Sequence, residues 1–316
     1  MRCVLRDAAM FAGIAFAAGM DVCLADGGGL LANSENVLRI RPGLVMAGMD
    51  DPPPAALPTE PVAGEPAKPE DLASHAGGES AEGLAKKLSN PVADLISVPF
   101  QFNYDSGFGP KNAGKITLNV QPVIPISISE DWNVIIRTIL PVIYQASPAN
   151  GIEDTTGLGD TTQSFFFSPK KGEIIWGVGP VIFWPTATDS TLGTRQWGFG
   201  PTAVVLKQDD GWTYGCLANH IWTIADNTGQ AVNSTYLQPF VSYTWKTATS
   251  LTLNTESTYD WINHRWTVPI NLMVSQVLKL GELPVSIQFG GRYYVDAAAG
   301  QPDWGLRLNF TLLFPK

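Results

Sequence analysis

Cysteine, histidine and charged residues are scarce in this chain of 316 residues. It holds three cysteines and three histidines, and charged residues make up 16% of it. A secreted form without its first 25 residues would keep only Cys216, which excludes an intramolecular disulfide. The histidines, His75, His220 and His264, lack a nearby His or Cys that would complete a zinc site, so we expect no metal and no cofactor.

Long apolar runs are also missing. Beyond the N-terminus no run approaches the roughly 18 residues that a membrane-spanning helix needs, which excludes a helical membrane protein. The formal net charge is -9 and no basic patch interrupts it, which argues against a nucleic-acid partner. The Gly-rich piece at 157–160 adjoins neither a helix start nor a Lys-Ser/Thr pair, so no nucleotide site follows.

The N-terminal region divides into three predicted parts. Residues 1–25 are typical of a secretory signal peptide, with Arg2 and Arg6 before an apolar stretch and cleavage after Ala25. Lipid attachment at Cys23 is the alternative, but Val22 stands where a small residue is expected. Residues 26–83 are Pro-rich and predict a disordered linker. Residues 84–94 predict a short helix and lead-in, and the helical pattern itself runs over 79–90.

From residue 95 to the end, twelve segments rich in β-branched and aromatic residues predict strands. We expect them at 95–105, 115–128, 132–144, 157–168, 174–187, 197–207, 212–224, 234–246, 249–261, 266–279, 283–295 and 304–314. Tight turns follow the even-numbered strands, and longer stretches follow all but one of the odd-numbered ones. Bacterial outer-membrane barrels have this alternation, with their short turns facing the periplasm. The predicted fold class is therefore an all-β, antiparallel transmembrane β-barrel.

Two-residue periodicity and tryptophan placement favour a membrane barrel over a soluble one. In the ninth strand Leu251 and Leu253 share one face, while Thr252 and Asn254 share the other. Alternation alone does not say which face meets lipid. However, Trp residues cluster at both ends of the strands, as in the aromatic girdles of membrane barrels. The predicted girdle residues are Trp132, Trp176, Trp184, Trp212, Trp245, Trp261, Trp266 and Trp304. Prolines inside the strands are expected to mark bulges or kinks.

Several short motifs point to one family. The run at 84–101 reads LAKKLSNPVADLISVPFQ, and the later landmarks are GLGD at 157–160, WGVGP at 176–180, PT at 185–186, LG at 192–193, WGFGP at 197–201, QP at 238–239, DW at 260–261, WTVP at 266–269 and FPK at 314–316. As a set they resemble a proteobacterial outer-membrane family associated by name with the meta-pathway of phenol degradation, whose members are often mislabelled neuromedin U. The resemblance implies a transporter-type barrel for hydrophobic or aromatic compounds. It implies no site residues.

The charged residues in inward phase are the candidate functional residues. They are Arg137, Glu256, Asp260, Arg292 and Arg307, expected among inward Asn and Gln side chains. Arg292 and Arg307 fall on neighbouring strands, so they need solvent or an acidic partner such as Glu256 or Asp260. A structural ion network that plugs the barrel is the alternative to a selectivity filter.

These observations predict a passive outer-membrane channel for small solutes, not an enzyme. The expected partners are outer-membrane lipid, the barrel assembly machinery, for which Phe314 is the recognition candidate, and a small-molecule solute. A structural or adhesive barrel whose N-terminal arm binds a periplasmic partner is one alternative. A membrane-embedded hydrolase that depends on His220 is another, although no recognisable nucleophile accompanies it.

Overall fold

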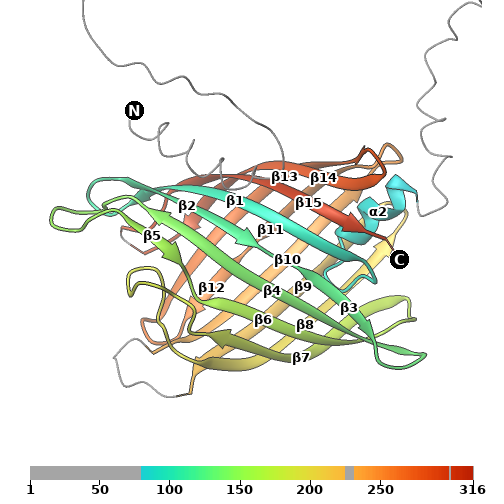
Figure 1. The fold of residues 1–316 in the computed structure, drawn as a ribbon, viewed down its shortest axis with the longest axis horizontal. Helices are drawn as coiled ribbons and strands as arrows, with labels where there is room; N and C mark the ends of the chain where they lie inside the picture. The colour runs from blue at the N-terminus through green and yellow to red at the C-terminus, as the bar shows by residue number, and fades with distance from the viewer. Residues whose placement is uncertain (1–79, 225–230, 299, 316) are drawn as a thin grey trace, which may run out of the picture. The chain divides into compact units, whose positions relative to one another are not determined.

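The computed structural model describes residues 80–224, 231–298 and 300–315, which form a closed antiparallel β-barrel of twelve strands (Figure 1). The predicted signal peptide, His75 and nearly all of the predicted linker lie outside these residues. Within the described ranges, no helix is both long and apolar enough to cross a membrane.

Nine strands are continuous and three are interrupted. The continuous strands are β1 (Ile96–Phe108), β4 (Trp132–Gln145), β7 (Ile174–Trp184), β8 (Gly198–Asp209), β9 (Trp212–Thr223), β10 (Asn233–Thr244), β13 (Arg265–Leu280), β14 (Leu283–Asp296) and β15 (Trp304–Phe314). The interrupted strands are β2 with β3 (Ala113–Val120 and Val123–Ser127), β5 with β6 (Thr155–Leu158 and Thr161–Pro169), and β11 with β12 (Thr249–Thr255 and Ser257–Asp260). The predicted strand count and its antiparallel order are confirmed.

The first and last strands close the barrel. β1 pairs with β15 from Ile96 opposite Phe314 to Ser106 opposite Trp304, and every other strand pairs with its neighbours in chain order. Closure leaves no free sheet edge, so the backbone N–H and C=O groups of each strand are satisfied by the two flanking strands.

Prolines explain the interruption between β11 and β12. The pairing of β10 with this strand stops and resumes around Pro239, and the pairing of β13 with it stops at Ile270 and resumes at Thr267, on either side of Pro269. Proline has no N–H to donate to the ladder. Glu256 therefore lies next to both proline positions, and the ladder is interrupted around it.

The outer face of the barrel is apolar and carries two aromatic belts. Trp132 packs edge-to-face on Trp176 at the short-turn end, with ring centroids 5.8 Å apart. At the long-loop end Tyr259 packs against both Trp261 and Trp266, at 4.8 and 4.9 Å. Nine of the ten Trp are among the exposed large apolar side chains, while Trp184 is half-buried against Trp197. This distribution matches a barrel that meets lipid between two girdles.

A short helix occupies the short-turn end. α2 (Ala81–Leu88) begins at Ser80, whose hydroxyl oxygen accepts the N–H of Gly83 at 3.1 Å, and it contacts β10, β11 and β13. Leu84 and Ala85 pack against Ala248 and Leu313 of the barrel. In Figure 1 α2 is the cyan helix beside the end of β15. Because the helix starts at Ala81, the predicted linker boundary at residue 83 falls three residues too late.

Candidate functional site

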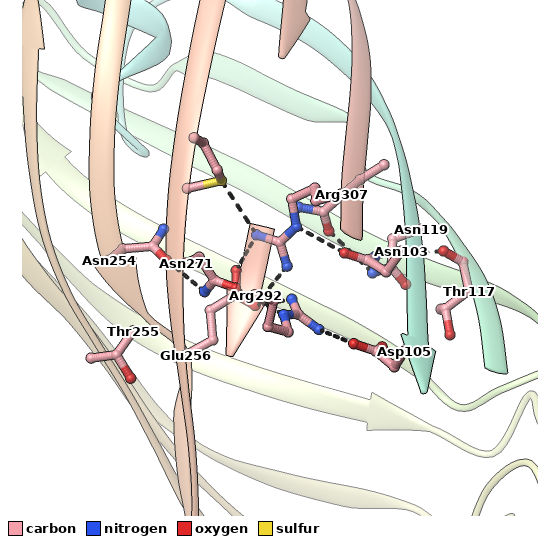
Figure 2. Close-up of polar contacts among 12 residues, drawn as sticks. Asn103, Asp105, Thr117, Asn119, Asn254, Thr255, Glu256, Asn271, Arg292 and Arg307 are labelled. Carbon is pink, nitrogen blue, oxygen red and sulfur yellow. Dashed lines mark hydrogen bonds and ion pairs between the residues drawn. The ribbon is translucent and has the colours of Figure 1, made fainter. Parts of the chain in front are cut away.

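One carboxylate inside the barrel holds two arginines. Glu256 accepts hydrogen bonds from Arg292 Nη2 at 2.7 Å and from Arg307 Nη1 and Nη2, both at 2.8 Å (Figure 2). The side chain of Arg307 is 4% exposed and that of Arg292 is 11% exposed. Buried guanidinium groups need a counter-charge, and the two-pronged contact with Arg307 is the strong form of this pairing.

Amide and carboxylate side chains on adjacent strands complete the arrangement. Arg307 Nε donates to Asn103 Oδ1 and Arg292 Nε donates to Asn271 Oδ1, each at 2.8 Å. Asp105 pairs with Arg292 at 3.4 Å. The set Asn103, Asp105, Glu256, Asn271, Arg292 and Arg307, here called the arginine network, joins five consecutive strands of the closed barrel, from the β11–β12 strand through β13, β14 and β15 to β1.

The predicted lumen residues do not all take part. Glu256 is the acidic partner expected for Arg292 and Arg307, which lie diagonally on paired strands, since Arg292 faces Gly305 and Arg307 faces Gly290. Asp260 was the alternative acidic partner, and its hydrogen bonds go elsewhere. Its carboxylate accepts the N–H groups of Ile262 and Asn263, at 2.9 and 3.1 Å, and thereby closes the turn between β12 and β13. It has the inward phase but lies at the very end of its strand.

Arg137 lies apart from the arginine network. It extends from β4, and its Nη2 donates to the amide oxygen of Gln121 at 3.1 Å. Across the ladder it faces Val123 of β3. The four charged candidates other than Asp260 thus separate into a paired group of three and a single cation on another strand.

The expectation of an otherwise polar lumen is wrong for one side of the barrel. Buried side chains from β4, β6, β8 and β9 pack together there with Val92 of the lead-in. This apolar cluster consists of Val92, Ile135, Phe166, Val204, Leu206 and Leu217, of which Ile135 is fully buried. Ile135 stands two residues from Arg137, so the two-residue period of β4 already placed an apolar side chain inside.

A cavity of about 220 Å³ lies between the N-terminal segment and the inner wall of the barrel. α2 and the residues that follow it cover one side, and Arg307 and Glu256 line the other. Arg137, Val123 and Phe240 also line it. The cavity therefore joins polar and apolar surfaces in one small volume.

A buried carboxylate outside the arginine network holds the loop between β7 and β8. The carboxylate of Asp160, which is 8% exposed, accepts the N–H groups of Ala187, Thr194 and Arg195 at 3.1, 2.6 and 3.1 Å, and the hydroxyl of Thr194 at 3.0 Å. A Cβ on Gly193 would stand 2.6 Å from this carboxylate, so the loop needs glycine there. Within the loop, hydrogen bonds from the backbone and side chain of Thr191 lower the pKa of Asp189.

Sequence reasoning missed Asn103, Asp105, Asn271 and Asp160. The first two share the inward phase of β1, so strand periodicity could have found them. Asn271 alternates with the exposed Ile270 and Leu272, so the period of β13 also gives its face, whereas Asp160 carries no such pattern. Their roles depend on a neighbouring strand and on a loop 27 to 35 residues away in the sequence.

His220 lies within the aromatic belt of the long-loop end. Its Nδ1 is 2.8 Å from the hydroxyl of Thr235, and its ring is 5.2 Å from that of Trp222. Among the described residues no cluster of His, Cys, Asp and Glu is arranged to hold a metal. These contacts are those of an amphipathic side chain in a girdle.

Comparison with known proteins places the fold. No protein-family model and no curated protein matches the chain in sequence. In structure it is similar to the COG4313 outer membrane channel from Pseudomonas putida F1, with a TM-score of 0.56 and 15% identity over 70% of this chain and 96% of that one. Outer membrane phospholipase A from Escherichia coli has a TM-score of 0.40 at 9% identity, over 69% and 96%. An anion-selective porin from Comamonas acidovorans has 0.37 at 7%, over 70% and 98%. The first likeness supports a barrel of the outer-membrane type.

Proposed function

We propose that this chain is an outer-membrane channel for the passive uptake of small, partly apolar solutes, aromatic compounds among them. The observation that carries the proposal is the cavity lined by Glu256 and Arg307 together with Val123 and Phe240, because one volume offers both hydrogen-bonding groups and apolar contact. Ligand sites commonly combine these surfaces. The motifs that resemble those of the phenol meta-pathway family support the same solute class.

The outward face supports a location in the bacterial outer membrane, with the short turns and the preceding N-terminal arm toward the periplasm. In that orientation the segment from Leu84 to Leu95 would close the periplasmic side of the cavity. Val92 is 5% exposed and packs with Ile135 and Phe166, so its apolar contact holds the segment in the barrel. Passage of a solute then requires this segment to move.

Planar-bilayer recording and liposome swelling with the refolded mature chain test the proposal. Val92→Asp puts a charge among apolar side chains, so the segment should leave the barrel and conductance should rise several-fold over the wild type. Val92→Ile keeps the apolar contact and is the matched control, with conductance expected near the wild-type value. If neither the wild type nor Val92→Asp gives discrete conductance or admits any solute, the chain is not a channel.

A further inference from the structure

Arg137 is the cation of the lumen whose charge is not balanced by a neighbour. Its recorded hydrogen bond goes to the neutral amide of Gln121, whereas Arg292 and Arg307 share Glu256. Among the described residues no carboxylate lies within ion-pair distance of Arg137. A half-buried guanidinium that lacks a counter-charge favours an anion brought from outside.

The charged residues that line the cavity also favour an anion. Its lining holds three basic residues, Lys87, Arg137 and Arg307, and one acidic residue, Glu256. Glu256 is already bound by both arginines of the network. Arg137 and Arg307 thus share this lining with a single carboxylate, although the whole chain carries a formal charge of -9.

Apolar groups lie next to this cation. Val123 is the cross-strand neighbour of Arg137, and Phe240 lines the cavity while it packs against the apolar cluster. The volume of about 220 Å³ is below the range of roughly 300–1,000 Å³ that is usual for drug-sized ligands. The occupant must therefore be small, with an apolar body beside its charged group.

We propose that this cavity binds a small carboxylate, such as an aromatic acid, whose carboxylate pairs with Arg137 while its apolar body packs on Val123 and Phe240. The planar guanidinium matches the two oxygens of a carboxylate. This inference rests on the proposed function, since it names the solute class that the channel selects.

Calorimetric titration of the refolded chain in detergent tests the site with benzoate and with benzamide, which has nearly the same shape but no charge. The wild type should bind benzoate more tightly than benzamide. Arg137→Gln should weaken benzoate binding by roughly ten- to a hundredfold, as expected for the loss of a charged hydrogen bond, and should leave benzamide binding unchanged. Arg137→Lys keeps the charge and should restore part of the affinity.

Arg265→Gln is the matched control, because Arg265 is exposed at the start of β13, outside the lumen. The proposal is overturned if the wild type does not bind benzoate, or if Arg137→Gln and Arg265→Gln bind it equally well. Liposome swelling separates the two hypotheses. If neutral solutes pass but benzoate does not bind, the proposed binding site is rejected and the channel function stands. If benzoate binds but no solute passes, the channel function is rejected and the binding site stands.

Discussion

At the scale of single residues, Glu256 decides how two arginines can be buried inside the barrel. It lies next to Pro239 and Pro269, where the pairing with both flanking strands is interrupted, and it pairs with Arg292 and Arg307. A buried ion pair adds little stability by itself, but removal of one partner leaves a buried charge that is not compensated. The network therefore constrains this side of the barrel through a single side chain.

Glu256→Gln keeps the shape of the side chain and removes its charge. We expect the free energy of unfolding to fall by about 3 kcal/mol, because Arg307 would lose its counter-charge and Arg292 would keep only Asp105. Denaturant titration followed by Trp fluorescence measures it. Glu173→Gln is the control, since the Glu173–Lys207 pair is exposed and should contribute nothing measurable. Equal midpoints for Glu256→Gln and the wild type would show that the network does not stabilise the barrel.

At the scale of elements, two segments outside the strands depend on contacts with the barrel interior. The segment from Leu84 to Leu95 is held by apolar packing through Leu84 and Val92. The loop between β7 and β8 is held instead by hydrogen bonds to Asp160. Such segments open at a lower free energy than the strands do, because fewer contacts must break.

Asp160→Ala removes the acceptor for three backbone N–H groups of that loop. We expect trypsin to cleave after Arg195, which is exposed, at least about tenfold faster in the folded protein, because the open form of the loop becomes more populated. Mass spectrometry of the fragments over time measures the rate. Asp154→Ala disturbs a different loop, where Asp154 accepts the N–H of Ser147, and should leave this rate unchanged. If both variants are cleaved at the wild-type rate, Asp160 does not hold the loop.

At the scale of the whole molecule, the barrel presents its apolar side chains in two directions. The outward set lies between two aromatic belts, while the inward set is confined to the apolar cluster on one side of the lumen. A soluble barrel buries its apolar face inside and keeps a polar exterior. Leu272, Leu308 and Phe289 are each exposed by more than two fifths, so this exterior needs lipid around it.

Arginine substitutions at two membrane depths along β13 test whether lipid surrounds the barrel. Leu272 is central in the strand and 54% exposed, and Leu280 is at its short-turn end and 66% exposed. In phospholipid vesicles Leu272→Arg should reduce the free energy of unfolding by about 2–4 kcal/mol, and Leu280→Arg by about 0–1 kcal/mol, because the cost of the charge falls toward the interface. Urea unfolding in vesicles measures both. Equal effects at the two positions would mean that lipid does not surround β13 as proposed.

Local patterns in the sequence determined the number of strands, their antiparallel order and the face to which most side chains point. The reason is physical: strand periodicity, turn residues and Trp at strand ends are set by neighbours a few residues apart. Twelve strands and the aromatic belts followed from such patterns, and Glu256 was one of the two acidic partners that they offered for Arg292 and Arg307.

Only the tertiary structure decided which inward residues meet. Periodicity gives the face of a strand but not the height of a residue or the side of the barrel that it occupies, so Asp260 shares the phase of Glu256 and yet closes a turn. The pairing of Asp105 with Arg292 joins residues 187 apart in the sequence. Barrel closure and strand register fix these neighbours, as they fix the separation of the apolar cluster from the arginine network and the cavity that Glu256 and Arg307 line.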